Sequence, residues 1–467
     1  MSVISASADT DETSAPVAEE SAPAGEPPLT PLNGWGRYPV LLGRERFSED
    51  LEAITRGAVL TRGMGKSYGD ASLPAAGENR PLANSTLADR ILSFNQESGM
   101  IRVEAGLCLQ RLHHFVMPKG WFVRVTPGTQ LITIGGAVAS DVHGKSHHVD
   151  GTFGEHVRSI RLRVAGGRVL ECSDEVEPEL FRATLGGMGL TGHILEVEFA
   201  LRRIPTSWIY QESERLDDID GVVERLKQAS ERWPFTVAWV DCFSKGSALG
   251  RGILMSGRWA EPHEATKPFK PIPNLMVPFL VPAWVPRTWG VKLFNSFYFA
   301  IHGAQTRHSI VHPFMFFYPL DWVKNWNRLY GPRGFTQYQC VLPVRAGNPV
   351  LRRMLELLQQ RGTVPYVNVV KDCGAEGKGT ISFPRPGISF ALDIPIAANL
   401  QSVVDEVNEM VLAEGGRVYL TKDAFTRGEH FRAMDPRVAE FNRVRRKWDP
   451  HGRLKSAQSV RMLGDPP

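Results

Sequence analysis

The sequence lacks the features that define several large protein classes. No uninterrupted apolar run is long enough to span a bilayer. The five cysteines are widely spaced and include no C-x-x-C pair, which indicates reduced, mostly buried thiols and no disulfide framework. No Arg-Gly or Lys-rich tract is present, so nucleic acid is a poor candidate partner. These absences predict a protein that is soluble, or at most peripheral at a membrane.

Basic residues are missing from residues 1–33, although this stretch holds six acidic ones. Because it has neither the basic region nor the apolar core of a secretory signal, we expect no signal peptide and a cytoplasmic location, peripheral at most to the inner membrane. Its Ala, Ser, Pro and Glu bias predicts a disordered acidic tail over 1–33. The whole chain has a net charge of +4, so the remainder carries a basic excess that suits an anionic ligand or surface.

The length of 467 residues predicts two or more domains, and the composition changes near residue 206. Glycine-rich loops dominate before that point, whereas a helix over 219–233 and a strand from 235 follow it. The segment Lys267–Ala300 contains six prolines, which exclude a regular helix through it. It is either a packed loop or an apolar flap that meets a lipid-like substrate or a membrane surface.

Three histidines stand close together in "GGAVASDVHGKSHHVDGTFG", residues 135–154. Zinc requires about four ligands, usually His or Cys, in a tetrahedron. His143, His147 and His148 lie on a glycine-flanked loop with no Cys pair nearby, and Lys145 adds a competing positive charge. We therefore expect no metal at this loop.

Glycine-rich stretches with small hydroxyl residues recur at 62–70, 126–141 and 185–194. Such loops let backbone N–H groups approach a pyrophosphate closely. None is a G-x-G-x-x-G fingerprint or a Walker A loop. Three of them in one region indicate a large, flat, phosphorylated cofactor.

The ordered motifs "RGMGKSYGD", "PGTQLITIGGAVASDVHGKSHHVDGTFGEHV" and "LFRATLGGMGLTGHI" resemble the FAD-binding half of the vanillyl-alcohol oxidase-type flavoprotein family. The likeness continues from Gly34 through "YVNVVKDCG", "GGRVYLTKD" and "RRKWDP". It implies an α+β fold of two domains, with a PCMH-type FAD-binding domain formed by 34–204 and 415–467. An antiparallel-sheet substrate domain, 205–414, would be inserted between these parts and would carry the flap 267–300.

Within the family, the resemblance is to oxidases of polyprenyl-phosphoryl-β-D-ribose. It implies FAD-dependent oxidation of the C2 hydroxyl to a 2-keto sugar, the first half of an epimerisation that supplies an arabinose donor for cell-envelope polysaccharide. The partner would be a separate NADH-dependent keto-reductase, and peripheral contact with a membrane is expected.

The resemblance also implies which residues bind the cofactor. The pyrophosphate would lie against Arg62, Gly63, Gly65, Lys66, Ser67, Tyr68, Gly69 and Asp70. The rest of FAD would lie against Gly128, Thr129, Thr133, Gly135, Gly136, Ala137, Ser140, His143, Ile194 and Tyr419.

The substrate pocket and the catalytic groups follow from the same resemblance. The pocket would be lined by Lys145, Trp239, Phe317, Gln337, Gln339, Asn368 and Lys371. Lys422 would be the base, because alcohol oxidation by a flavin requires a group that takes the hydroxyl proton. Lys145, also assigned to catalysis, and Lys371 would lower its pKa and hold the substrate phosphate. His143 is also assigned to the catalytic residues, as a polar contact of the flavin rather than a proton carrier.

Three positions depart from the relatives. Lys66 stands where many family members attach FAD through a histidine, so we expect noncovalent FAD. Ala391 replaces a pocket cysteine, and thiol-directed inhibitors should form no adduct here. Phe317 replaces a tyrosine.

Three alternatives remain open from the residues. The first is an FAD-linked oxidase of another sugar, polyol or aldonolactone. The second is a metal-dependent hydrolase built on His143, His147 and His148. The third is a noncatalytic, membrane-associated module that uses the proline-rich flap.

Overall fold

The computed structural model describes residues 26–265, 275–282, 287–343 and 349–466. Most of the predicted tail and parts of the flap therefore lie outside the described residues. Inside the predicted tail, however, Thr30–Asn33 forms strand β1, which pairs with β2 (Val40–Gly43). The tail prediction is wrong for these residues, because their apolar side chains pair and pack with the first domain.

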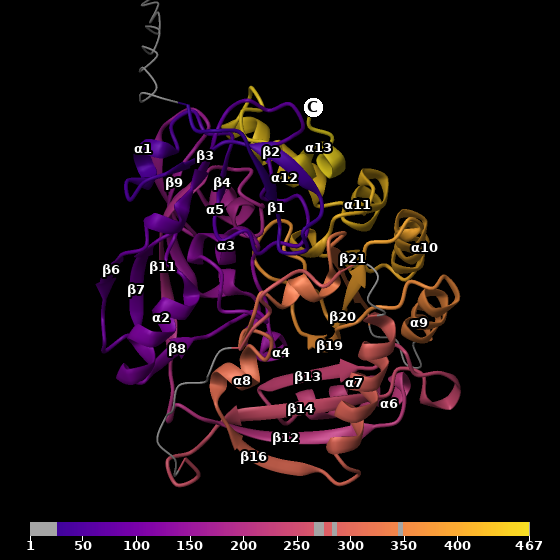
Figure 1. The fold of residues 1–467 in the computed structure, drawn as a ribbon. Helices are drawn as coiled ribbons and strands as arrows, with labels where there is room; N and C mark the ends of the chain where they lie inside the picture. Colours follow the sequence, from indigo (N-terminus) through magenta and orange to yellow (C-terminus); the bar gives the residue numbers. More distant parts are fainter. Residues whose placement is uncertain (1–25, 266–274, 283–286, 344–348, 467) are drawn as a thin grey trace, which may run out of the picture.

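The N-terminal half contains two further sheets besides the β1–β2 pair (Figure 1). A small parallel sheet has the order β3 (Glu45–Phe47), β5 (Leu82–Asn84), β4 (Leu60–Arg62). A six-stranded antiparallel sheet has the strand order β10-β9-β11-β7-β6, and its sixth strand, β8, pairs with β11. The bounds of these strands are β6 (Ile91–Phe94), β7 (Met100–Glu104), β8 (Trp121–Val123), β9 (Val157–Arg163), β10 (Val169–Ser173) and β11 (His193–Arg203). β9 and β10 form an antiparallel hairpin around Gly166 and Gly167. The helices of this half are α1 (Leu51–Ile54), α2 (Leu109–Val116), α3 (Ile134–Ala139), α4 (His147–Asp150) and α5 (Pro178–Thr184).

The second half is built on an eight-stranded sheet, drawn in the lower part of Figure 1. Its order is β16 (Arg307–Val311), β12 (Ile209–Leu216), β14 (Gly252–Trp259), β13 (Phe235–Val240), β19 (Asn368–Cys373), β20 (Gly387–Pro395), β18 (Phe335–Leu342), β21 (Arg417–Val418). One face of this sheet buries its apolar side chains against α6 (Ile219–Ser230), α9 (Val350–Gln360) and α10 (Leu400–Ala413).

The opposite face of the eight-stranded sheet supports α7 (Arg287–Ile301), which begins just after Pro286. The prediction that Lys267–Ala300 contains no regular helix is wrong for the last part of the segment. No proline follows Pro286 there, so the backbone N–H groups can form the hydrogen bonds of a helix. In the same half, β15 (Leu275–Met276) pairs in parallel with β17 (Val323–Lys324), and α8 is Pro313–Phe317.

The chain ends in three helices that return to the N-terminal half (Figure 1): α11 (Gly428–Met434), α12 (Val438–Trp448) and α13 (Ala457–Leu463). Arg461 of α13 forms an ion pair with Asp70, 2.7 Å away. The predicted boundary at 204/205 falls between β11 and β12, whereas β21, in the predicted C-terminal part of the FAD domain, pairs with β18. The division into domains stays a prediction.

Candidate active site

A cavity of about 290 Å³ lies where the glycine-rich loops meet the eight-stranded sheet. One wall comes from the loop at 63–68, the segment 126–133 and the start of the loop at 142–145. The opposite wall comes from β18, β19 and β20 and from the 3₁₀ turn η6 (Leu420–Lys422). Segments that are far apart in the sequence thus converge on one chamber.

The loop wall presents bare backbone to the cavity. A side chain added at Gly128 would meet no atom within 4 Å, so this part of the wall is open peptide. Thr133 caps α3 by accepting a hydrogen bond from the N–H of Gly136, 3.1 Å away. Gly65 has a φ of +61°, a conformation that glycine adopts without strain. A flat surface of this kind fits a flat cofactor that carries phosphate.

Three buried lysines give the cavity a cationic character: Lys145 comes from the loop wall, and Lys371 and Lys422 come from the opposite wall. Burial and, to a smaller extent, the neighbouring charge of Lys371 lower the pKa of Lys145 to about 7. Burial also lowers the pKa of Lys371 and of Lys422. Because the pKa values of Lys145 and Lys422 are lowered to about 7, each of these two groups can act either as a cation or as a base.

Lys145 and Lys422 are held in different ways. The ammonium of Lys145 donates a hydrogen bond to the carbonyl oxygen of Phe317 at 3.1 Å. The Lys422 nitrogen lies 4.1 Å from the centre of the Tyr68 ring. Both contacts fix a lysine nitrogen at the wall of the cavity.

His143 lies in the same wall as a neutral ring. Burial first, and then the charges of Lys371, His147 and Lys422, keep its pKa well below the usual value. Its Nε2 is 2.9 Å from the amide nitrogen of Gln339, which also donates to Ser389 Oγ at 2.9 Å. Because an amide nitrogen only donates, His143 Nε2 is the acceptor and the ring proton is on Nδ1.

Two carboxylates reach the cavity among the residues that the structure describes. Asp321 accepts a hydrogen bond from the N–H of Gln130 at 2.8 Å. Asp393 accepts one from the amide of Gln337, its cross-strand partner, and its Oδ2 is buried without a hydrogen-bond partner. Neither residue was predicted from the sequence. For Asp393 a pattern was present, because Ser389, Ala391 and Asp393 alternate along β20 and therefore share one face of the sheet.

Comparisons with known proteins agree with this geometry. Residues 53–173 match the family model described as "FAD binding domain". The chain is 34% identical over 450 residues to decaprenylphosphoryl-beta-D-ribose oxidase of Mycolicibacterium smegmatis, covering 92% of this chain and 97% of the relative. The chain belongs to the decaprenylphosphoryl-β-D-ribose oxidase family. It is an FAD-dependent oxidoreductase with the α+β fold of PCMH-type flavoproteins, as the resemblance predicted.

Other relatives lie at greater distance or are uninformative about chemistry. An uncharacterized protein of Streptomyces coelicolor is 33% identical over 370 residues, which covers 77% of this chain and all of the relative. A putative D-arabinono-1,4-lactone oxidase of Neurospora crassa is 29% identical over 174 residues, 37% of this chain and 30% of the relative. The likeness to lactone oxidases is thus confined to a minor part of the chain.

Most residues that the oxidase-family resemblance assigned to FAD do line the cavity: Gly63, Gly65, Lys66, Ser67, Tyr68, Gly128, Thr129, Thr133, Gly136, Ser140, His143 and Tyr419. Six others do not: Arg62, Gly69, Asp70, Gly135, Ala137 and Ile194. Arg62 instead donates to the carbonyl oxygen of Asn33 at 2.7 Å, and Asp70 pairs with Arg461. These two charged residues brace the loop from behind and leave its backbone to face the cavity.

Five of the predicted substrate residues line the cavity: Lys145, Phe317, Gln337, Gln339 and Lys371. Trp239 does not: it lies two residues beyond the cavity-lining Val237 along β13, and the ring of Tyr298 of α7 packs on it at 5.0 Å. Asn368 does not, because it alternates with Val367 and Val369 and points to the other side of the sheet. There it donates to the carbonyl oxygen of Val240 at 3.4 Å.

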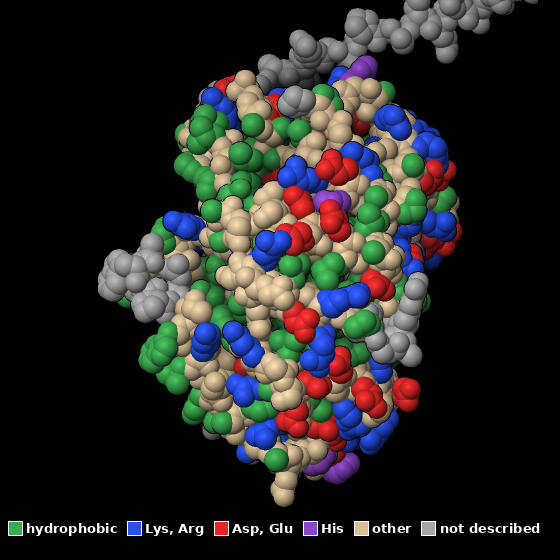
Figure 2. All heavy atoms as spheres, turned by 90° about the vertical axis from the view of Figure 1, so that its right-hand side faces the viewer, with side chains coloured by type: hydrophobic (Ala, Val, Ile, Leu, Met, Phe, Trp, Pro, Cys, Tyr) green, Lys and Arg blue, Asp and Glu red, His purple; other side chains and the backbone are tan. Residues whose placement is uncertain are grey.

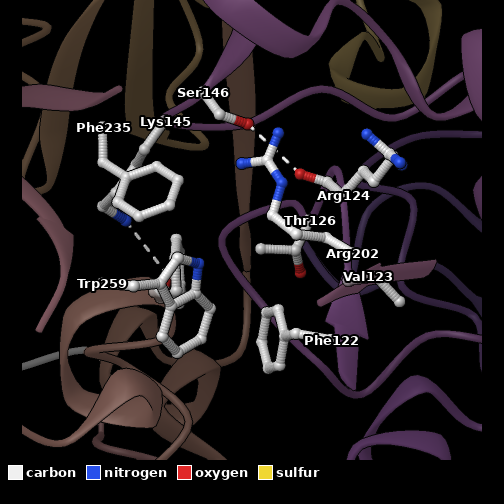
Figure 3. A pocket seen from close by; sticks show the side chains of 10 residues that line it. Phe122, Val123, Arg124, Thr126, Lys145, Ser146, Arg202, Phe235 and Trp259 are labelled. Atoms are coloured by element: carbon white, nitrogen blue, oxygen red, sulfur yellow. Dashed lines mark hydrogen bonds between the residues drawn. The ribbon is translucent and has the colours of Figure 1, made fainter. Parts of the chain in front are cut away.

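A second, much smaller cavity adjoins Lys145 (Figure 3). Its volume of about 10 Å³ suits a single water molecule at most. Figure 3 shows Lys145 beside Phe235 and Trp259, with Arg202 across the cavity. Arg202 is already paired with Asp150, so this space serves the packing around Lys145.

The three histidines of the loop do not converge. His143 bonds to Gln339, His147 Nδ1 accepts from the N–H of Gly374 at 3.0 Å, and His148 Nε2 contacts the carbonyl of Trp233 at 2.8 Å. Within the described part of the chain, no group of three or more His, Cys, Asp or Glu residues could hold a metal ion. Nor does any described helix have the length and apolar character needed to cross a membrane.

Proposed function

We propose that this protein oxidises the C2 hydroxyl of a polyprenyl-phosphoryl-β-D-ribose to the 2-keto sugar. The observation that carries the proposal is one chamber that combines a backbone cradle for a flat phosphorylated cofactor with three buried lysines. The relative of Mycolicibacterium smegmatis named as a decaprenylphosphoryl-ribose oxidase supports this substrate class.

FAD, when bound, supplies the acceptor for the hydride that leaves C2. The residues of the chain do the rest. Lys422, held over the Tyr68 ring with its pKa lowered by burial to about 7, takes the hydroxyl proton at Nζ in its neutral form. Lys145 and Lys371 hold the phosphate, which they can reach because both line the same cavity. His143 stays neutral and contacts the ring system of the cofactor.

The cofactor residues described above would hold FAD without a covalent bond. Lys66 occupies the position at which, by the resemblance, many family members attach FAD through a histidine. Its side-chain nitrogen lies 3.4 Å from the centre of the Trp35 ring. Precipitation of the protein with acid should therefore release all yellow colour into the supernatant, whereas a flavin retained in the pellet would contradict noncovalent binding.

Anaerobic mixing of the holoenzyme with a polyprenyl-phosphoryl-ribose tests the reaction. We expect the flavin absorbance to bleach with this substrate and not with free sugars, polyols or aldonolactones. Bleaching by one of those compounds instead would favour the alternative oxidase. Lys422→Ala should slow bleaching by about 100-fold or more while FAD stays bound. Lys447→Ala, at an exposed lysine paired with Glu179, is the matched control and should leave the rate unchanged.

The 2-keto product requires a second activity. We propose a separate NADH-dependent keto-reductase that delivers hydride to C2 and so completes the epimerisation to the arabinose donor. A keto sugar that accumulates with the oxidase alone, and disappears when the reductase and NADH are added, is the expected result.

We also propose that the protein contacts a membrane surface peripherally, at the inner membrane and on its cytoplasmic side. The support comes from α7, whose exposed face is apolar: Trp289, Leu293, Phe294, Phe297 and Ile301 are each at least 44% exposed. Figure 2 shows hydrophobic side chains gathered along the left edge of the lower half of the molecule. An apolar helical face rimmed by basic residues is typical of helices that lie in a membrane interface.

The opposite face of α7 is fixed to the eight-stranded sheet. Asn295 donates to Asp241 at 2.8 Å, and Phe299 is sandwiched by the guanidinium groups of Arg215 and Arg251 at 4.6 and 4.5 Å. The helix is thus a rigid platform beside the cavity, and its exposed residues repeat every three or four positions.

The charge around α7 suits an anionic lipid surface. Between Glu264 and Asp321 the sequence has no acidic residue but five basic ones: Lys267, Lys270, Arg287, Lys292 and Arg307. In the same region, Leu275, Met276 and Phe279 are also exposed, and β15 links them directly to the cavity-lining β17.

Flotation with vesicles that contain anionic lipid tests this contact. The double variant Trp289→Ser/Phe297→Ser should bind several-fold less than the wild type, because it loses two exposed aromatic side chains. Phe47→Ser, which removes an equally exposed aromatic residue far from α7, should bind like the wild type. Equal binding of all three proteins would contradict the proposal, and a change of oligomeric state in the double variant would indicate a second copy as the occupant.

A further inference from the structure

The carboxylate of Asp393 is a buried group that the mechanism above does not use. Its residue is 1% exposed and lies in β20 directly opposite Gln337 of β18. The Gln337 amide donates to Oδ1, whereas Oδ2 has no hydrogen-bond partner among the described residues. Both Asp393 and Gln337 line the active-site cavity.

An unpaired carboxylate oxygen in the protein interior is costly unless a cation or a donor meets it. The other carboxylate in the cavity, Asp321, is already satisfied by a backbone N–H. Asp393 therefore needs a partner from the cavity itself.

Lys422 is the cation whose charge acts on Asp393. Both residues line the cavity. Burial raises the pKa of Asp393 to about 7, whereas the hydrogen bond from Gln337 and the charge of Lys422 favour the ionised carboxylate, and Asp393 in turn favours the ammonium of Lys422. Lys371 acts on Lys422 in the opposite direction. The phenols of Tyr68 and Tyr330 are also ionisable neighbours, and their pKa values are raised well above 10 by burial and by the charge of Asp393, so both stay neutral. His143 lies near Lys422 as well, and burial keeps its pKa well below the usual value, so it too stays neutral.

We propose that Asp393 is the positioning residue for Lys422: it orients the amine toward the substrate hydroxyl and stabilises the ammonium that forms there. This inference rests on the proposed function. In the step, the hydroxyl O–H bond breaks and its proton passes to Lys422 Nζ. The C2 hydrogen leaves with the electron pair of the C2–H bond as a hydride, for which FAD would be the acceptor, and the electron pair of the broken O–H bond forms the C=O bond at C2. An ion pair of ammonium and carboxylate remains.

The sign of the pH effect follows from the charge. Without the carboxylate, the ammonium of Lys422 loses a favourable interaction, so its pKa falls and the neutral amine becomes a weaker base. The rate of flavin reduction rises as Lys422 loses its proton. In Asp393→Asn, the midpoint of that rise should therefore move to lower pH, by about one unit or more, while the plateau rate falls about 100-fold.

Stopped-flow reduction of the FAD holoenzyme by polyprenyl-phosphoryl-ribose, measured from pH 5 to 9, provides the test. Asp393→Glu keeps the charge and should restore the wild-type midpoint. Asp372→Asn is the matched control, because Asp372 is a buried aspartate of the neighbouring strand that pairs with Lys227 at 2.7 Å and does not line the cavity. It should retain the wild-type midpoint even if it lowers stability. A wild-type midpoint in Asp393→Asn would overturn the inference.

A measurement without substrate separates this inference from the proposed function. Trace acetylation of the holoenzyme at a series of pH values, quantified at Lys422 by mass spectrometry, reports the fraction of neutral amine. The titration of Lys422 should move to lower pH in Asp393→Asn and stay unchanged in Asp372→Asn. An unmoved titration overturns the pairing. A moved titration in an enzyme that the substrate fails to reduce would keep the pairing and reject the proposed substrate.

Discussion

Lys371 occupies the middle of the cationic wall, on the central strand β19. Its charge lowers the pKa values of Lys145, His143, His147 and Lys422, although burial is the larger cause at each of them. A single side chain therefore influences the protonation of most groups that face the substrate, while it also offers a charge to the phosphate.

Lys371→Met should move the pH dependence of flavin reduction in the direction opposite to Asp393→Asn. Because a repelling cation is removed, the pKa of Lys422 rises, and the ascending limb of the rate should shift to higher pH by up to about one unit. Loss of a phosphate contact should raise the KM for the lipid-linked sugar at the same time. Steady-state and stopped-flow measurements from pH 5 to 9 check both effects, and an unmoved limb would exclude Lys371 as a modulator of the base.

At the scale of elements, the loop at 63–70 and the turn η6 are joined tightly. The N–H of Tyr68 donates to the carbonyl oxygen of Thr421 at 2.9 Å, and the ring of Tyr68 lies under Lys422. Gly69 is next to this contact, where an added side chain would overlap the backbone carbonyl of Asp423. The base and the cofactor loop therefore share one backbone junction.

Gly69→Ala should force this junction apart. We expect a loss of about 1–3 kcal/mol in the free energy of unfolding and a slower reduction of the flavin, since Lys422 moves with η6. Gly166→Ala in the β9–β10 turn is the control, because its added side chain meets nothing within 4 Å. Chemical denaturation and stopped-flow reduction of both variants provide the comparison; equal stability of the two would show that the junction adapts.

Local patterns were sufficient to predict many elements, and long-range contacts account for what they missed. The β9–β10 hairpin and the helices α6, α9 and α10 follow from turn chemistry and apolar periodicity. The position of α7 was missed because the many prolines before residue 287 obscured the proline-free stretch after it.

In the candidate site, too, local patterns predict part of the residues and long-range contacts determine the rest. The glycine-rich loops and the lysines carry recognisable patterns, and most of them line the cavity. The bracing role of Asp70 depends on Arg461, almost 400 residues later in the chain, and no local pattern predicts such a pair. In the sequence, Asp393 stands out only as a charged residue in an apolar strand. Its place in the site depends on β18, the neighbouring strand, which brings Gln337 opposite it.

At the scale of the whole molecule, several histidines are buried in neutral form far from one another. Burial lowers the pKa of His113 to about 3, of His147 to about 3 and of His193 to about 4. In the unfolded chain these rings take up protons below about pH 6.5. Their contribution to stability is therefore complete above pH 6.5 and is lost progressively as the pH falls toward 4.

The free energy of unfolding should thus fall steeply between pH 6.5 and 4, by about 1.4 kcal/mol per pH unit for each such histidine. His113→Leu, in α2, should reduce this slope, since His113 stacks on Phe122 at 4.2 Å. His451→Leu, at an exposed histidine, should not. Denaturant titrations at several pH values measure the slopes, and equal slopes for both variants would reject this origin of acid sensitivity.

The exposed aromatic stripe of α7 has a kinetic consequence. An enzyme anchored along such a stripe meets its lipid-linked sugar by diffusion in two dimensions, and the sugar needs to rise only from the headgroup layer into the cavity. Turnover would then depend on the mole fraction of substrate in the surface and not on its bulk concentration. Diluting the substrate with inert lipid would slow the enzyme, whereas diluting the whole suspension with buffer would hardly change the rate per bound enzyme.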